Sequence, residues 1–284
     1  MLTIFTIPKP FKGHISIIQK NAIKSWTLLQ PSCEIILFGD EEGTEEIAQE
    51  LGLRHIKSIA INEYGTPLLN DVFKKAHQEA HNELLCYVNA DILLLQNFME
   101  AIKKTQIFKK TYLMVGQRWD VDINVPWDFS RENWQEEMRE YLKNQAKIHP
   151  PAGSDYFVFP RETFDSIPSF AVGRAGWDNW MIYNALSSKI PVIDATAVTT
   201  VIHQNHDYSH VKQSTGKKYE NPESTKNREI IGDVNRICTL KDANFLLTPK
   251  GLVKIIPSKE NSVAQHLRKY LKWTCEHFLC TKKD

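Results

Sequence analysis

Short apolar runs alternate with helix-patterned segments along the first 116 residues, and no other feature constrains the fold as strongly. The runs are rich in β-branched and aromatic residues, which favour strands. The predicted strands cover residues 2–7, 34–38, 56–61, 84–88 and 112–115. The segments between them have apolar residues three and four positions apart, as amphipathic helices do. The predicted helices cover residues 14–29, 44–51, 68–81 and 97–104. Strands separated by helices predict an α/β fold, Rossmann-like, with a mostly parallel central sheet flanked by helices.

The alternation loosens after residue 117. The later predicted elements are a helix over residues 132–143, a strand over 156–159, a helix over 178–186 and strand sequence over 191–202. Residues 207–227 are polar and contain Gly216 and Pro222, which predicts a loop. The length of 284 residues suits one large α/β domain.

The composition excludes several classes of protein. A formal net charge of +1 gives no case for a nucleic-acid binder. Five cysteines, an odd number without a C-x-x-C pair, argue against a disulfide framework or a zinc site and favour a reducing compartment. The longest nearly apolar run, residues 84–95, contains Asn89 and Asp91 and cannot span a bilayer. We therefore expect a cytoplasmic protein.

Polar residues that directly follow the predicted strands are the candidates for ligand binding. In open parallel sheets, ligands bind beyond the carboxyl ends of the strands. The side chains in this position are Asp40, Asn89, Asp91 and Arg118.

Asn89 and Asp91 lie between apolar runs, where a carboxylate is costly to bury unless it has a function. A divalent cation that bridges two phosphates would supply one, because Mg²⁺ and Mn²⁺ often use only one or two carboxylates beside substrate phosphates. The same side chains could instead cap a turn or the following helix. A second acid pair, Asp120 and Asp122, matches the D-x-D pattern. The alternative is that this pair lies in a solvated loop and that Arg118 neutralises its acids.

Two later turns carry further carboxylates. Asp155 lies in a polar turn before an aromatic strand, where it could bind sugar hydroxyls or only form the turn. Asp178 lies between Trp177 and Trp180, after Gly176 and before a helix. Indole faces commonly pack on sugars, and a carboxylate beside them can act as a base. The alternative is that Asp178 caps the helix while both indoles lie in the core.

Two histidines, His203 and His206, follow the last strand-like segment of this half. Neutral imidazole can ligate Mn²⁺. A single histidine at such a place is more often structural. Two histidines together indicate a metal-binding role as strongly as a structural one.

In their order along the chain, these segments resemble the nucleotide-sugar-dependent glycosyltransferases of the GT-A fold. The opening strand–helix–strand unit that ends at Asp40 resembles the nucleotide-binding half of that fold. Asn89 and Asp91 resemble its metal-binding D-x-D position, with Asn89 replacing the first acid. The Trp-Asp-Asn-Trp segment around Asp178 resembles the one that carries the catalytic base in inverting members, and His203 resembles the late histidine that completes the metal shell.

The resemblance covers residues 1–206 and implies transfer of a sugar from a nucleoside-diphosphate-sugar donor to an acceptor hydroxyl, assisted by Mn²⁺ or Mg²⁺. The implied acceptor is a saccharide or a lipid-linked molecule, and Asp40 would lie near the base or ribose of the donor. The donor-binding candidates are Asp40, Asn89, Asp91 and Arg118; the metal candidates are Asp91, His203 and His206; the catalytic candidates are Asp178 and Asp155.

We accordingly expect one GT-A-like domain over residues 1–258, with a nucleotide-binding half (1–116), an acceptor and catalytic half (117–206) and a loop-rich extension (207–258). Residues 259–284 are predicted to form an amphipathic helix with basic residues off its apolar face. Such a helix either docks on the domain or rests on an anionic membrane surface, which would make the protein peripheral to that membrane.

Two other functions stay open. A sugar nucleotidyltransferase would show a Gly-rich loop straight after the first strand, where residues 8–14 contain a single glycine. A non-catalytic module that binds a nucleotide-sugar or a glycan would explain the missing acid at Asn89. Donor hydrolysis with and without Mn²⁺ separates the binding module from the enzyme.

Overall fold

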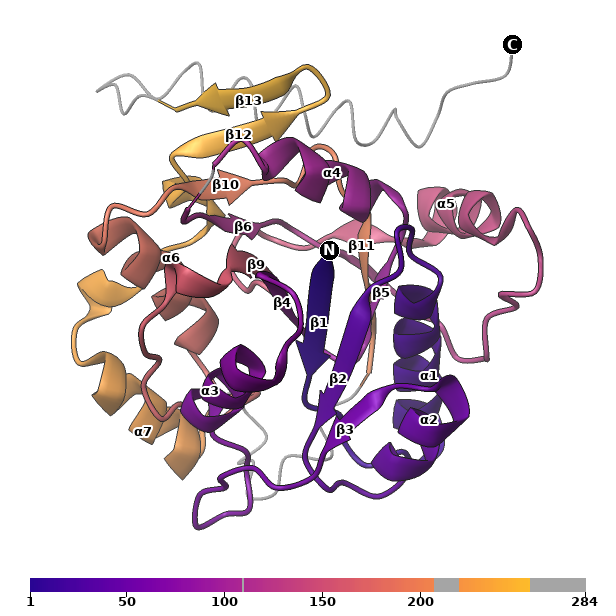
Figure 1. Ribbon diagram of the computed structural model, residues 1–284, viewed down its shortest axis with the longest axis horizontal. Coiled ribbons are helices and arrows are strands. Elements are labelled where there is room, and N and C mark those ends of the chain that lie inside the picture. The colour runs from indigo at the N-terminus through magenta and orange to yellow at the C-terminus, as the bar shows by residue number, and fades with distance from the viewer. Residues whose placement is uncertain (109, 207–219, 256–284) are drawn as a thin grey trace.

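A nine-stranded sheet forms the centre of the computed structural model, which describes residues 1–108, 110–206 and 220–255 (Figure 1). In spatial order its strands are β13 (Gly251–Lys254), β12 (Phe245–Thr248), β10 (Val192–Asp194), β6 (Leu113–Val115), β9 (Tyr156–Pro160), β4 (Leu84–Val88), β1 (Leu2–Thr6), β2 (Glu34–Phe38) and β3 (Arg54–Ile56). Neighbouring strands are parallel, except that β9 is antiparallel to β4 and β6, and β13 to β12. The mostly parallel α/β fold predicted from the sequence is confirmed.

Helices cover both faces of this sheet (Figure 1). The first face carries α1 (Gly13–Thr27), α2 (Thr44–Leu51) and α4 (Asn97–Thr105); the second carries α3 (Leu69–Glu79), α6 (Trp177–Ser187) and α7 (Pro222–Ile231). Successive strand residues point to opposite faces, so Ile4 of β1 packs in the first core and Phe5 in the second. Both faces are buried, which is why the strands lack the polar alternation of a half-exposed sheet.

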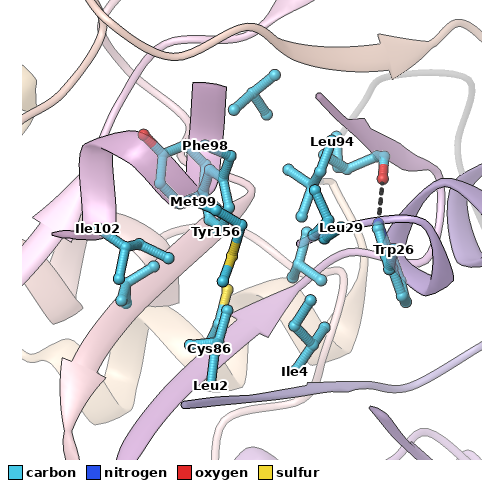
Figure 2. Packing of buried hydrophobic residues seen from close by; sticks show 14 of the residues in the cluster. Leu2, Ile4, Trp26, Leu29, Cys86, Leu94, Phe98, Met99, Ile102 and Tyr156 are labelled. Atoms are coloured by element: carbon cyan, nitrogen blue, oxygen red, sulfur yellow. Dashed lines mark hydrogen bonds between the residues drawn. The ribbon is translucent and has the colours of Figure 1, made fainter. Parts of the chain in front are cut away.

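The first core fixes α1 beside the loop that follows β4 (Figure 2). Trp26 of α1 is fully buried, and its indole Nε1 donates to the carbonyl of Ile92 at 2.8 Å. Phe98 of α4 packs edge-on against Tyr156 of β9, with ring centroids 5.2 Å apart. A buried indole with its N–H paired holds the backbone next to Asp91 in one place, which matters for the site described below.

A second, four-stranded sheet joins segments that are distant in the sequence. Its strands, in spatial order, are β5 (Ile92–Leu94), β11 (Val201–Gln204), β7 (Trp119–Val121) and β8 (Lys147–Ile148). β11 is antiparallel to β5 and parallel to β7, so His203 pairs with Ile92 on one side and with Asp120 on the other. The helix α5 (Trp134–Gln145) shares a small apolar core with this sheet.

The strand predicted over residues 56–61 is largely wrong. The strand β3 ends at Ile56, and Ile61 takes part only in an isolated bridge. The cause is the turn that follows: the Asn62 side chain accepts from the backbone N–H groups of Tyr64 and Thr66, at 2.9 and 3.0 Å. An asparagine that bonds the backbone two residues on forms a turn in place of a strand.

The loop predicted over residues 207–227 is wrong over its last part, where α7 begins at Pro222. Asn221 caps this helix, because its side chain accepts from the Ser224 backbone N–H at 2.8 Å, and proline suits the first helical position. The proline that indicated a loop is therefore, together with Asn221, the start signal of a helix. The first part of that loop and the helix expected over residues 259–284 lie outside the described residues.

Candidate active site at the carboxyl edge of the sheet

The order of the strands reverses next to β1. The chain runs from β1 through β2 to β3, and it then returns to β4 on the other side of β1. In open α/β sheets, ligands bind beyond the carboxyl ends of the strands at such a reversal. Lys9 follows β1, Asn89 and Asp91 follow β4, and the exposed Asp40 follows β2 at the same edge.

Asp91, His203 and His206 form what we call the cation cluster: one ligand atom from each lies within 4.8 Å of the others. Asp91 lies between β4 and β5, whereas both histidines come from the end of β11. The antiparallel pairing of β5 with β11 therefore brings together residues more than a hundred positions apart. The three metal candidates predicted from the sequence are thus neighbours in the structure.

The chemistry of the cation cluster fits a divalent metal ion. Asp91 is buried, its Oδ2 lies 3.1 Å from Nε2 of His206, and its Oδ1 has no hydrogen-bond partner among the described residues. An orphaned buried carboxylate oxygen is costly in the absence of a ligand. A carboxylate with two imidazoles is a donor set that first-row divalent metals accept.

Asp91 is held in its ionised form. Burial alone would raise the pKa of Asp91, but the positive charge of Lys9, together with His206 and His203, holds that pKa well below its usual range. Lys9 Nζ lies 3.4 Å from Asp91 Oδ2 and 3.1 Å from His206 Nε2. A cationic group is therefore already in contact with two members of the cation cluster.

Asp120 lies beside one histidine of the cation cluster. Its Oδ1 lies 3.2 Å from Nδ1 of His203, the residue with which it pairs across β7 and β11. A carboxylate on one ring nitrogen leaves the other nitrogen to face a metal, which is the usual support for a ligating histidine. The second D-x-D acid, Asp122, is exposed and instead accepts from the Asn205 side chain at 2.8 Å.

Arg118, Asp120, Asp155 and His149 form a second group, the arginine cluster. Arg118 Nε donates to Asp120 Oδ1 at 2.8 Å, and its Nη1 donates to Asp155 Oδ2. His149 Nδ1 lies 2.6 Å from Asp120 Oδ2. Burial would raise the pKa of Asp120, but the hydrogen bonds from His149, His203 and Arg118 hold it well below its usual range. Arg118 thus neutralises both carboxylates.

Asn89 contacts the arginine cluster through Asp155. Its side-chain Nδ2 donates to Asp155 Oδ1 at 2.7 Å, and its backbone N–H donates to the Asp155 carbonyl at 2.9 Å. Asp155 therefore has one oxygen on Asn89 and the other on Arg118. An asparagine suits this place because its amide can donate, which a second aspartate could not.

Asp178 lies at the second position of α6, next to a turn that contains Gly153. Its Oδ2 accepts from the Ser154 backbone N–H at 3.1 Å. Gly153 has φ +88°, and a β-carbon placed on it would lie 3.5 Å from His149 Nε2 and 3.9 Å from Asp178 Oδ2. The absent side chain of Gly153 therefore leaves room between a carboxylate and an imidazole. Burial, with a smaller effect from the charge of Asp155, raises the pKa of Asp178.

The two indoles beside Asp178 pack against aromatic side chains. Trp177 is buried in the second core, edge-on to Tyr87 at 5.4 Å, and Trp180 packs on Phe170 at 5.3 Å. The suggestion that they pack on a sugar is therefore wrong for Trp177, whose indole lies in the core, while Trp180 is only partly buried. The N-cap of α6 is Gly176 rather than Asp178.

Comparison with known proteins identifies the fold. No family model matches the chain, and a sequence search of curated proteins finds no match. GalNAc-T7, solved with UDP, GalNAc and Mn²⁺, is similar over 82% of this chain and 48% of its own, with a TM-score of 0.52 and 14% identity. Glucosyl-3-phosphoglycerate synthase from Mycobacterium tuberculosis, solved with Mn²⁺, UDP and phosphoglyceric acid, is similar over 74% and 72%, with a TM-score of 0.46 and 14% identity.

The chain has a GT-A glycosyltransferase fold. At this level of identity the similarity concerns the path of the chain, and the chemistry depends on the residues described above. In the part of the chain that the structure describes, every helix is too short or too polar to cross a membrane.

Sequence reasoning missed two residues of the candidate site, Lys9 and His149. Lys9 follows the first predicted strand directly, so the rule that selected Asp40 and Asp91 could also have selected it. His149 had no such signal. It lies just after the two-residue strand β8, and it reaches Asp120 only because β8 pairs with β7.

Proposed function

We propose that the protein is a glycosyltransferase that moves a sugar from a nucleoside-diphosphate-sugar donor to an acceptor hydroxyl. The observation that carries the proposal is the cation cluster at the reversal in strand order of a GT-A fold. That edge of the sheet is where a nucleotide would bind, and a buried ionised carboxylate with two imidazoles is there to meet its phosphates.

Asp91, His203 and His206 would hold the metal ion. When bound, Mn²⁺ or Mg²⁺ would neutralise the charge that develops on the leaving diphosphate. Two imidazoles favour Mn²⁺, because Mg²⁺ takes oxygen ligands. Asp120 would keep His203 in the orientation in which its remaining ring nitrogen faces the metal. Asp40, exposed at the end of β2, would contact the base or the ribose.

On the acceptor side, Asp178 would remove the proton from the attacking hydroxyl. Its raised pKa makes it a stronger base than an exposed aspartate. Asp155, the second catalytic candidate, has its two oxygens bonded to Arg118 and Asn89, so it is less available as a base or as a nucleophile. A base without a nucleophilic carboxylate beside it favours a single displacement, which inverts the anomeric carbon.

The acceptor would be a saccharide or a lipid-linked molecule, in the cytoplasm or at the inner face of a membrane, in the synthesis of a glycan. What supports an acceptor at the Asp178 side is the room left by Gly153 between Asp178 and His149.

The test is hydrolysis of a panel of nucleotide-sugars by the purified protein, with Mn²⁺ and with EDTA. We expect slow release of the nucleoside diphosphate from one donor, and loss of that release with EDTA and in Asp91→Asn. Asp122→Asn is the matched control, because Asp122 is an exposed acid bonded to Asn205. Binding of a nucleotide-sugar without any turnover, with or without acceptors, would favour a non-catalytic module, and absence of binding would contradict the proposal.

A further inference from the structure

The backbone of Lys9 is fixed by hydrogen bonds, although the residue lies in a loop. Its backbone N–H donates to Gln19 Oε1 at 2.6 Å, and its carbonyl accepts from Gln19 Nε2 at 2.8 Å. Gln19 lies in α1 and is only 1% exposed. Pro8 and Pro10 flank the lysine and restrict its backbone further. One buried amide and two prolines therefore fix the point from which the Lys9 side chain starts.

From that point the ammonium group reaches the cation cluster. Lys9 Nζ lies 3.4 Å from Asp91 Oδ2 and 3.1 Å from His206 Nε2, which are atoms of two of the three metal candidates. A divalent cation bound to these atoms and an ammonium group at the same distances would repel each other strongly in a buried site. Metal and lysine cannot both keep these contacts.

The Lys9 side chain can move away from the cation cluster toward solvent. It is 31% exposed, whereas the Asp91 side chain is 9% exposed, so the lysine enters the cluster from the solvent side. Its four-carbon stem is flexible although its backbone is fixed. A lysine beside a bound diphosphate is a common phosphate contact, because its ammonium is a compact point charge.

We propose that Lys9 is an internal counter-cation of the cation cluster, which a divalent metal displaces and which then binds the donor diphosphate. The proposal rests on the function proposed above. It implies that metal alone binds weakly, because it must displace an ammonium group that has no better partner. Metal and diphosphate bind more tightly together, because the diphosphate gives the displaced lysine a new partner.

The inference is tested with two affinities of Lys9→Met. The affinity for Mn²⁺ alone is measured from the electron paramagnetic resonance signal of free Mn²⁺. The affinity of the Mn²⁺-saturated protein for inorganic pyrophosphate is measured by calorimetry. We expect changes of opposite sign, with Mn²⁺ binding about tenfold tighter and pyrophosphate binding about tenfold weaker. Lys9→Gln should change both affinities in the same directions, and it replaces Lys9→Met if the melting temperature shows that the methionine variant is not folded.

Lys12→Met is the matched control, since Lys12 lies three residues on and is exposed in an ion pair with Glu42. We expect both of its affinities to stay within about twofold of wild type, as for an exposed pair. Unchanged or weaker Mn²⁺ binding in Lys9→Met would overturn the counter-cation role, and unchanged pyrophosphate binding would overturn the diphosphate contact. If wild type and Lys9→Met both fail to bind Mn²⁺, the metal site and the inference fail together. The proposed function is judged separately, by donor hydrolysis in the wild type.

Discussion

Asp91 and Asp155 are equally buried, each 7% exposed, and they follow or precede strands at the same edge of the sheet, yet their oxygens are satisfied differently. Asp155 has one oxygen on Arg118 and the other on Asn89. Asp91 has one oxygen near Lys9 and His206, and the other without a partner among the described residues. Both oxygens of the Asp155 carboxylate in the arginine cluster are therefore bonded, whereas the Asp91 carboxylate in the cation cluster keeps one oxygen unbonded among the described residues.

Because of this difference, we expect the two clusters to have different roles. The arginine cluster is a scaffold: it fixes the turn that precedes β9 and, through Ser154, the place of Asp178. The cation cluster is the part with an unpartnered carboxylate oxygen, Oδ1 of Asp91, among the described residues. Variants in the two clusters should therefore differ in which property they damage.

The largest effect is expected at Asp178, the proposed base, whose carboxylate the turn beside the arginine cluster contacts. Asp178→Asn should lower turnover by about 10²–10⁴-fold, because a positioned general base contributes about that much. Donor affinity, measured by calorimetry, should stay nearly unchanged. Asp165→Asn, at an exposed aspartate, serves as the control. Loss of donor binding or a much lower melting temperature would mean that Asp178 has a structural or donor-binding role.

The next largest effect concerns stability. Arg118→Met should lower the free energy of unfolding by about 3–5 kcal/mol, because it leaves the buried carboxylate of Asp155 and the partly buried carboxylate of Asp120 without their cation. Arg131→Met is the matched control: Arg131 also bonds two carboxylates but is 58% exposed, so the loss should stay below about 1 kcal/mol. Urea unfolding measures both, and equal losses would remove the distinction between scaffold and surface pairs.

A tenfold effect is expected from filling the space beside Asp178. Gly153→Ala places a methyl group 3.5 Å from His149 Nε2 and 3.9 Å from Asp178 Oδ2, so the KM for the acceptor should rise about tenfold while donor affinity is kept. Gly173→Ala controls for backbone strain, since Gly173 also has a positive φ, +67°, but no atom near its absent β-carbon. If both variants change KM equally, strain rather than the filled space is responsible.

The smallest effect is a difference in pH dependence between two acids. The raised pKa of Asp178 means that ionisation of its carboxyl costs stability as pH rises above the unfolded value near 4, so the stability of Asp178→Asn relative to wild type should increase with pH above about 4. The lowered pKa of Asp120 has the opposite sign: Asp120→Asn should be less stable by a constant amount above about pH 4, and the difference should shrink only below it. Urea unfolding at several pH values checks both, and parallel curves would contradict the account.

The sequence predicts the parts of the site that depend on parallel strands. Asp40, Asp91 and Arg118 follow apolar runs, and parallel strands bring their carboxyl ends to one edge. The ion pair between Arg118 and Asp155 could not be predicted, because it depends on β9 running antiparallel between β4 and β6.

The same limit applies to the smaller sheet. β5, β7 and β8 have two or three residues each, too few for a periodic pattern, and yet they bring Asp120 and His149 to His203. The tryptophans beside Asp178 mislead for another reason. Indoles are as common in cores as in sugar sites, and only packing shows which of the two applies.

The central claim, that Asp91 couples a metal ion to the donor diphosphate, is tested most directly by calorimetry. The ligand is the nucleoside diphosphate that gives the largest thermal shift, titrated with and without Mn²⁺ into wild type, Asp91→Asn and Asp122→Asn. We expect Mn²⁺ to tighten binding in wild type and Asp122→Asn, and to have no effect in Asp91→Asn, which should keep its fold. The same metal-coupled affinity in Asp91→Asn would contradict the claim, and loss of that coupling in Asp122→Asn instead would move the metal site to Asp120 and Asp122.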